Sequence, residues 1–135
     1  MLLIQLLSTS RWLPLVVFFL ASVRLKSLVT TQIPEHLSCE NTFSYIAGSQ
    51  FEKYLDSLFH HTLYINGSAS ISANAKKGSY PDEAYGLLLC RGDVSEKTCQ
   101  DCIAAATDKI LSDCHFKKEA IIWYDQCLIR FSMQI

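Results

Sequence analysis

Residues 89–102 have the sequence Leu89-Cys90-Arg91-Gly92-Asp93-Val94-Ser95-Glu96-Lys97-Thr98-Cys99-Gln100-Asp101-Cys102. The three cysteines in this stretch follow the spacing C-x8-C-x2-C, and Cys39, Cys114 and Cys127 complete a set of six. An even number of cysteines in a small exported domain is typical of a disulfide framework. The stretch therefore predicts an oxidising compartment and a fold that disulfides stabilise.

The first 31 residues have the features of a secretory signal peptide. An apolar run from Trp12 to Val23 lies between Arg11 and Arg24. Its length of about 12 residues is shorter than the ~20 residues that a membrane-spanning helix needs, and it matches the apolar region of a signal peptide. We therefore predict a signal peptide over residues 1–31, although no Ala-x-Ala triplet defines the cleavage site. The alternatives are an uncleaved signal anchor and a buried core helix.

Removal of this leader leaves one small acidic domain, residues 32–135. Arg11, Arg24 and Lys26 are the basic residues of the leader, and all 13 acidic residues follow it. The mature chain therefore carries a net charge of about −4, which makes general attraction to nucleic acid or to anionic lipid unfavourable. No second long apolar run follows, so we expect no membrane span after cleavage. A domain of ~104 residues has a core of only modest stability by itself.

Apolar residues at helical spacing predict two helices in the mature domain. The first extends over residues 49–63. The second begins after Ser95 or Asp93, either of which can cap it, and ends near Asp113. Both apolar stripes recur every three to four residues, as one face of a helix does. The first stripe consists of Phe51, Tyr54, Leu55, Leu58, Phe59, Thr62 and Leu63, and the second of Cys99, Cys102, Ile103, Ala106 and Ile110.

Strand signals lie before, between and after these helices. Residues 84–90 form an apolar run that predicts a buried strand, residues 121–124 and 127–133 predict two more, and residues 36–46 are irregular or strand-like. Residues 65–79 are rich in Ser, Ala, Asn and Gly, which predicts a loop with a possible short strand. In the last strand, Cys127, Ile129, Phe131 and Met133 alternate with Leu128, Arg130 and Ser132. This order of elements favours an α+β domain with two helices packed on one face of an antiparallel sheet.

The cysteine spacing leaves several interpretations open. A zinc site of Cys99, Cys102, Cys114 and Cys127 is disfavoured, because structural zinc sites usually contain two close cysteine pairs and only one is present. A thioredoxin-like role for Cys99 and Cys102 rests on two-residue spacing alone, which is weak evidence. A sensor of extracellular oxidants is a third alternative, but buried structural disulfides resist reduction. We expect no bound metal.

Three short motifs are weaker signals of function. Asn66-Gly67-Ser68 is an N-glycosylation sequon, which is meaningful in an exported protein. The adjacent His60 and His61 point about 100° apart on a helix, which favours a solvated face over a shared metal. Arg91-Gly92-Asp93 spells an integrin-recognition tripeptide, but it follows a framework cysteine and leads into a helix cap, which favours coincidence. No acid–base pair, nucleophile–histidine pair or phosphate-binding loop stands out, so we predict a protein that is not an enzyme and needs no cofactor.

Two longer segments carry a more specific signal. They are Tyr85-Gly86-Leu87-Leu88-Leu89-Cys90-Arg91-Gly92-Asp93-Val94-Ser95, followed by Cys99 and Cys102, and Ala120-Ile121-Ile122-Trp123-Tyr124-Asp125-Gln126-Cys127-Leu128-Ile129-Arg130-Phe131-Ser132. Both resemble a plant family, the ginkbilobin-homologous or stress-antifungal domain. The similarity extends over roughly residues 36–132, with all six cysteines in register. The family includes cysteine-rich secretory proteins, the ectodomains of cysteine-rich receptor-like kinases and plasmodesmata-located proteins, and its fold implies a sheet of roughly five strands.

The resemblance also implies a disulfide pairing and a ligand site. The implied disulfides are Cys39–Cys114, Cys90–Cys99 and Cys102–Cys127. The family's mannose site implies an Asn directly after the first cysteine, an Arg seven residues after the fifth and a Glu five residues after the sixth. This chain has Glu40, Ile121 and Ser132 at those positions. Ile121 has no hydrogen-bonding side chain, so we predict that mannose is not bound.

Two hypotheses of function follow. The favoured one is a secreted, non-enzymatic binding module of the plant apoplast, similar to stress- and defence-related antifungal proteins, with an extracellular protein or glycan as its partner. The alternative is a truncated ectodomain repeat of a cysteine-rich receptor-like kinase or of a two-domain secretory protein. The sequence beyond Ile135 would distinguish them.

Overall fold

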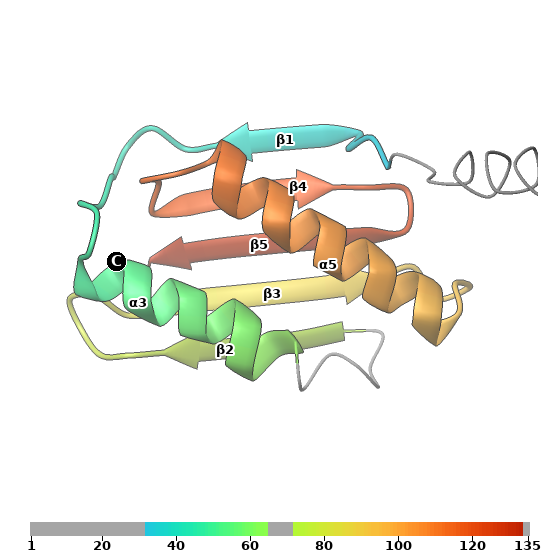
Figure 1. Ribbon diagram of the computed structural model, residues 1–135, viewed down its shortest axis with the longest axis horizontal. Coiled ribbons are helices and arrows are strands. Elements are labelled where there is room, and N and C mark those ends of the chain that lie inside the picture. Colours follow the sequence, from blue (N-terminus) through green and yellow to red (C-terminus); the bar gives the residue numbers. More distant parts are fainter. Residues whose placement is uncertain (1–31, 65–71, 134–135) are drawn as a thin grey trace, which may run out of the picture. The chain divides into compact units, whose positions relative to one another are not determined.

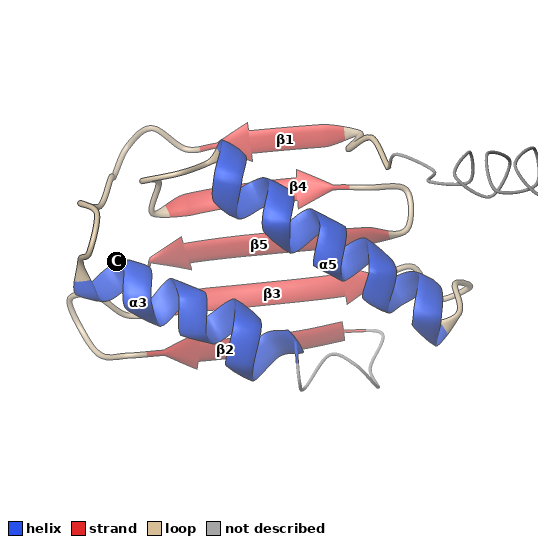
Figure 2. Ribbon diagram, in the orientation of Figure 1, coloured by secondary structure: helices blue, strands red, loops and turns tan. Residues whose placement is uncertain are grey.

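The computed structural model describes residues 32–64 and 72–133, which form a two-layer α+β domain. The predicted signal peptide and the sequon at Asn66 lie outside the described residues. Both helices lie on the same face of a five-stranded sheet (Figures 1 and 2). The predicted fold class is therefore confirmed. Within the described residues, no helix is both long enough and apolar enough to cross a membrane.

The sheet is antiparallel throughout, and its strands follow the order β1-β4-β5-β3-β2. The strand β5 is therefore the middle of the sheet, while β1 and β2 form its edges (Figure 1). The bounds are His36–Cys39 for β1, Ser72–Lys77 for β2, Ala84–Cys90 for β3, Glu119–Trp123 for β4 and Cys127–Met133 for β5.

Two helical segments cover the sheet. The helix α3, Gln50–Ser57, begins at Ser49, whose hydroxyl oxygen accepts a hydrogen bond from the backbone N–H of Glu52 at 3.3 Å. The helix α5, Glu96–Asp113, begins in the same way at Ser95, which accepts from the Thr98 N–H at 3.1 Å. Side-chain caps of this kind satisfy backbone donors that the first turn leaves unpaired. Ser95 is therefore the cap of the second predicted helix, and Asp93 instead forms an ion pair with Arg91.

The core lies between the helices and the inner face of the sheet. The second predicted stripe is confirmed, because Cys102, Ala106 and Ile110 are fully buried on α5. The inner-facing residues of β5 are equally enclosed, with Ile129 and Phe131 at the centre and the Phe131 ring edge-on to Phe59 at 6.1 Å. The core therefore forms where one face of each helix, with apolar residues every three to four positions, packs on the sheet face formed by every second strand residue.

The first predicted helix differs from expectation in its second half. Residues Leu58–Leu63 form a π-helical segment, η2, directly after α3. The wider turn places Leu63 fully in the core, while Thr62 is half-buried, as Tyr54 is earlier in the stripe. The side chains of Leu58 and Leu63 then lie against Gly86 of β3, where a residue with a β-carbon would meet them.

Two strand predictions can be compared with the structure. The possible short strand in residues 65–79 is present as the six-residue strand β2, which pairs with β3 along its whole length. Pairing with a strong neighbour overrides the weak strand propensity of its Ser, Ala, Asn and Lys residues. The strand β3 was expected to be buried, but Leu87 and Leu89 point away from the core and are 37% and 44% exposed. Among the described residues, no helix covers that side of the sheet (Figure 2).

Candidate functional site: the outer face of the sheet

Three disulfides hold the scaffold on which the candidate site lies. Cys39–Cys114 joins β1 to the end of α5, Cys90–Cys99 joins β3 to the first turns of α5, and Cys102–Cys127 joins α5 to β5. The Cα–Cα distances of 5.4, 5.7 and 6.1 Å are those of ordinary disulfides. These are the pairs that the family resemblance implies. All three attach α5 to the sheet, so the outer face of the sheet is presented on a rigid support.

The outer face consists of the strand residues that point away from the helices. The strand register arranges them in three rows that cross the sheet, and the hydrogen bond from the Glu40 N–H to the Glu119 carbonyl extends β1 by one position. From β1 to β2, the polar row is Glu40, Glu119, Ser132, Tyr85 and Lys76, the middle row is Ser38, Ile121, Arg130, Leu87 and Asn74, and the apolar row is His36, Trp123, Leu128, Leu89 and Ser72.

An apolar patch occupies one half of this face. Leu89, Leu128 and Trp123 are direct neighbours in the apolar row, and Leu87 and Ile121 lie beside them in the middle row. Trp123 is 47% exposed, whereas Leu128, which lies between Trp123 and Leu89 in the row, is only 8% exposed. A group of large apolar side chains on one open face is typical of an interaction surface. We define these five residues as the apolar patch.

A small polar hollow adjoins the patch at the β1 side. Its volume is about 170 Å³. Arg130 donates a hydrogen bond to the Glu119 carboxylate at 2.6 Å across β4 and β5. The lining residues are Ser38, Glu40, Glu119, Ala120, Ile121 and Arg130. The hollow therefore combines an internal ion pair with an additional carboxylate at Glu40.

The structure brings together the three positions that the resemblance links to mannose. Glu40 and Ile121 both line the hollow, and Ser132 is the register partner of Glu119. The side chains, however, have different chemistry from the family pattern. Ile121 contributes apolar surface where the pattern has a guanidinium, and Ser132 has only a short hydroxyl where the pattern has a carboxylate. The three positions are therefore neighbours on the outer face, but their side chains differ from the family pattern.

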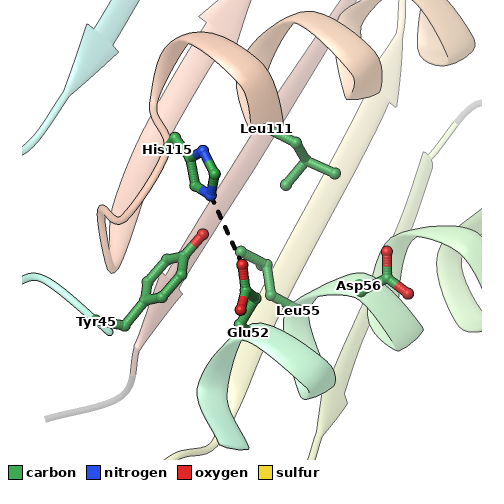
Figure 3. A pocket seen from close by; sticks show the side chains of 6 residues that line it. All are labelled: Tyr45, Glu52, Leu55, Asp56, Leu111 and His115. Atoms are coloured by element: carbon green, nitrogen blue, oxygen red, sulfur yellow. Dashed lines mark ion pairs between the residues drawn. The ribbon is translucent and has the colours of Figure 1, made fainter. Parts of the chain in front are cut away.

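A second concavity lies between α3 and the end of α5 (Figure 3). It has a volume of about 190 Å³, and its apolar lining consists of Leu55 and Leu111. Glu52 and His115 face each other across it, with 3.6 Å between the Glu52 Oε1 and His115 Nε2 atoms. Tyr45 lines the same concavity, and burial raises the pKa of its phenol, with a smaller contribution from the Glu52 carboxylate.

The polar groups of this second concavity already stabilise the fold. The Glu52 Oε2 atom accepts a hydrogen bond from the Gly48 N–H at 2.6 Å, which completes the cap of α3. Asp56, at the rim, lies 3.0 Å from the Nδ1 atom of His60. Both carboxylates therefore have internal partners, and the concavity has little unused hydrogen-bonding capacity to offer a ligand.

The remaining motifs have local structural roles. Arg91 of the Arg91-Gly92-Asp93 tripeptide pairs with Asp93 and, at 2.7 Å, with Asp125 in the loop between β4 and β5. Its guanidinium is thus engaged within the chain. Among the described residues, no group of three or more His, Cys, Asp or Glu side chains is arranged to hold a metal ion.

Comparisons with known proteins agree with this architecture. Residues 38–134 match the family model described as salt stress response/antifungal. The chain is 37% identical over 122 residues to cysteine-rich repeat secretory protein 9 of Arabidopsis thaliana, covering 89% of this chain and 37% of that protein. It is 39% identical over 99 residues to cysteine-rich receptor-like protein kinase 25 of the same plant, covering 71% of this chain and 15% of the kinase.

A solved structure shows the same fold. The tandem DUF26 ectodomain of the Arabidopsis thaliana cysteine-rich receptor-like protein PDLP8 superimposes with a TM-score of 0.72 at 21% identity, covering 77% of this chain and 50% of that one. Together, the disulfide-bonded α+β fold and the register of its cysteines define a cysteine-rich domain of the kind found in plant secretory proteins and receptor-like kinases. The chain belongs to the salt stress response/antifungal family. It spans less than half the length of the secretory relative and about half of the tandem ectodomain.

The apolar patch was not predicted from the sequence. Its members belong to runs that also supply core residues, so hydrophobicity alone does not separate Leu88 from Leu89. The available signal was the alternation in β5, which assigned Leu128 to the face opposite Ile129 and Phe131. Applied to β4 and β3, the same alternation would have placed Trp123, Ile121, Leu87 and Leu89 beside it.

Proposed function

We propose that this protein is a secreted, non-enzymatic binding module of the plant extracellular space whose outer sheet face contacts protein and does not bind mannose. The family supports secretion and an extracellular role, because its relatives include secretory proteins and receptor-like kinases. The support for a protein contact is Ile121. It stands at a position that the resemblance assigns to mannose recognition and instead continues the apolar patch toward β1.

Surfaces that bind sugars differ in chemistry from surfaces that bind proteins. Sugars are recognised by hydrogen bonds that fix each hydroxyl, and a missing donor leaves polar groups unpaired in the bound state. Protein interfaces instead bury aromatic and aliphatic side chains at their centre and place polar groups at the rim. The outer face resembles the second arrangement, with Trp123 and Leu89 in the apolar patch and Glu119 and Lys76 around it. Arg130 lies between Ile121 and Leu87 and is paired with Glu119.

A glycan array and a designed variant test this proposal. We expect no mannoside signal from the mature wild-type chain. The triple variant Glu40→Asn, Ile121→Arg, Ser132→Glu restores the family pattern and is expected to gain mannose binding. The matched control carries Ile46→Arg, which adds a cation at an exposed residue outside the sheet. A clear mannoside signal from the wild-type chain would refute the proposal.

A second candidate function is that of one ectodomain repeat within a longer receptor-like kinase or two-domain secretory protein. The coverage of the relatives supports it, since the chain matches 37% of the secretory protein, 15% of the kinase and half of a tandem ectodomain. The transcript beyond the codon for Ile135 tests it. A second set of six cysteines, a membrane span or a kinase domain there would favour this candidate, and a stop codon would favour the small secreted module.

A further inference from the structure

We propose that the outer face docks against the same face of a second copy of this chain, forming a symmetric face-to-face dimer. This inference rests on the proposed function, because it names the protein that the outer face contacts. Two sheets packed face to face are a common arrangement in β proteins, with the strands of one sheet rotated by roughly 30° relative to the other. The apolar patch is the surface that such packing would bury.

The edges of the sheet are poor sites for association. The edge strand β1 has only four residues, and the other edge strand, β2, carries Lys76 and Lys77. Short edge strands and edge lysines are features that oppose strand-to-strand addition. The open face, rather than an edge, is therefore the surface available to a second sheet.

The strand order makes the face self-complementary. Because β5 is the middle of five strands, a two-fold axis along β5 places β4 over β3 and β1 over β2 of the second copy. Residues in each row then meet residues of the same row. Trp123 meets Leu89 and Ile121 meets Leu87, in both directions, while Leu128 meets its own copy at the axis. All five members of the apolar patch are therefore paired with one another.

The charges at the edges match under the same axis. In the polar row, Glu40 of one copy faces Lys76 of the other, and symmetry forms this pair twice. Lys76 also lies 3.0 Å from the Glu83 carboxylate of its own chain, so in the dimer its ammonium is shared between two carboxylates. The rotation between packed sheets displaces the edges by roughly 5 Å, which two long side chains can span. Arg130 lies at the axis, but its guanidinium is drawn toward Glu119 of its own chain at 2.6 Å. The like charges at the centre are thus already neutralised.

The size of the face limits the strength of this dimer. Five strands about 4.8 Å apart and about 20 Å long offer roughly 400 Å² on each copy, whereas stable complexes bury about 800 Å² per partner. We therefore expect a weak, reversible dimer with a dissociation constant in the range of about 10–1,000 µM.

Sedimentation equilibrium of the mature, oxidised chain measures this association. Trp123 is the only tryptophan after the leader, so its fluorescence reports directly on the face. We expect the emission to shift to shorter wavelength as dimer forms, and Trp123→Ser to weaken dimerisation more than thirtyfold, as for a central aromatic residue of an interface. The control Ile46→Ser removes an apolar residue that is 81% exposed and lies outside the sheet, and it should leave the dimer unchanged. A wild-type chain that stays monomeric at about 1 mM would overturn the inference.

A charge exchange tests the register independently of Trp123. Each of Glu40→Lys and Lys76→Glu alone places like charges opposite each other in the dimer and should weaken it about tenfold. Mixed in equal amounts, the two variants should associate at least as tightly as wild type, because the substituted side chains then face opposite charges. Circular dichroism and the Tm of each variant establish that the monomers remain folded. A mixture that associates no better than either variant alone would exclude this register.

The outcomes also separate this inference from the proposed function. A chain that is monomeric and does not bind mannose overturns only the dimer. A chain that binds mannose overturns the proposed function, whatever its state of association.

Discussion

The two faces of the same sheet use similar residues for different purposes. Along β3, Gly86 and Leu88 point inward and are enclosed by the helices, whereas Leu87 and Leu89 point outward and remain partly exposed. The inner face is closed by two helical segments and three disulfides, whereas residues 32–64 and 72–133 place no helix on the outer face. Apolar character alone therefore does not indicate which residues stabilise the fold. The side of the sheet decides whether a leucine belongs to the core or to a binding surface.

Loss of the disulfides should have the largest effect on the inner face. The chain-entropy model assigns about 4.5 kcal/mol to Cys39–Cys114, 3.5 to Cys102–Cys127 and 2.7 to Cys90–Cys99, which together rival the ~5–15 kcal/mol total stability of a domain. We expect the mature chain to be unfolded at 37 °C in excess reductant. Thermal scans followed by circular dichroism, with the oxidised chain as control, measure this, and a cooperative transition that survives reduction would contradict it.

Replacing neighbouring leucines compares the two faces directly. Leu88 is 1% exposed and Leu89 is 44% exposed, so Leu88→Ala should lower the free energy of unfolding by about 2–5 kcal/mol. Leu89→Ala removes the same atoms from the open face and should change stability by less than about 1 kcal/mol. Chemical denaturation of both variants gives the two values. Equal losses would mean that the outer face is as enclosed as the core.

Two glycines allow the same comparison between an enclosed and an open position with a smaller change in volume. A β-carbon at Gly86 would lie 2.9 Å from Leu58 Cδ2 and closer still to Leu63 Cδ1, so Gly86→Ala should cost about 1–3 kcal/mol through overpacking. Gly92, in the loop before α5, has no atom within 4 Å of that position. Gly92→Ala is therefore the matched control, and urea unfolding should show little change. An unaltered Gly86→Ala protein would show that η2 can move away from the sheet.

The pH dependence of stability should be the smallest effect, because the ion pairs concerned are exposed. Hydrogen bonds from Lys76 and then Tyr85 lower the pKa of Glu83, and a hydrogen bond from Lys109 lowers the pKa of Asp113. A carboxyl group with a lowered pKa in the folded state stabilises the protein above its unfolded pKa of about 4, and this contribution is lost as the pH falls through the folded value. The Tm should thus be level from pH 5 to 7 and fall below about pH 4. Glu83→Gln should flatten part of that fall, and a Tm that rises on acidification would contradict the assignment.

Much of the architecture was predictable from local patterns. The stripe containing Cys102, Ala106 and Ile110 and the alternation through Ile129 and Phe131 placed α5 and β5 correctly, because each period matches one element whose buried face is uniform. The end of the first helix was not predictable in the same way. The π-helical turn in η2 depends on the space above Gly86, which exists only once β3 lies beneath it.

The features of the candidate site also fall into those that local sequence predicts and those that depend on long-range packing. Residue identity and cysteine register were enough to indicate the family and the positions Glu40, Ile121 and Ser132, and they led to the prediction that mannose is not bound. The packed structure was needed to show that the helices leave open the face of Leu87, Leu89 and Trp123, and that Glu40 and Lys76 lie at its opposite edges. Alternation groups side chains by face within each strand, but strand order and the side on which the helices pack are set by contacts between segments far apart in the chain.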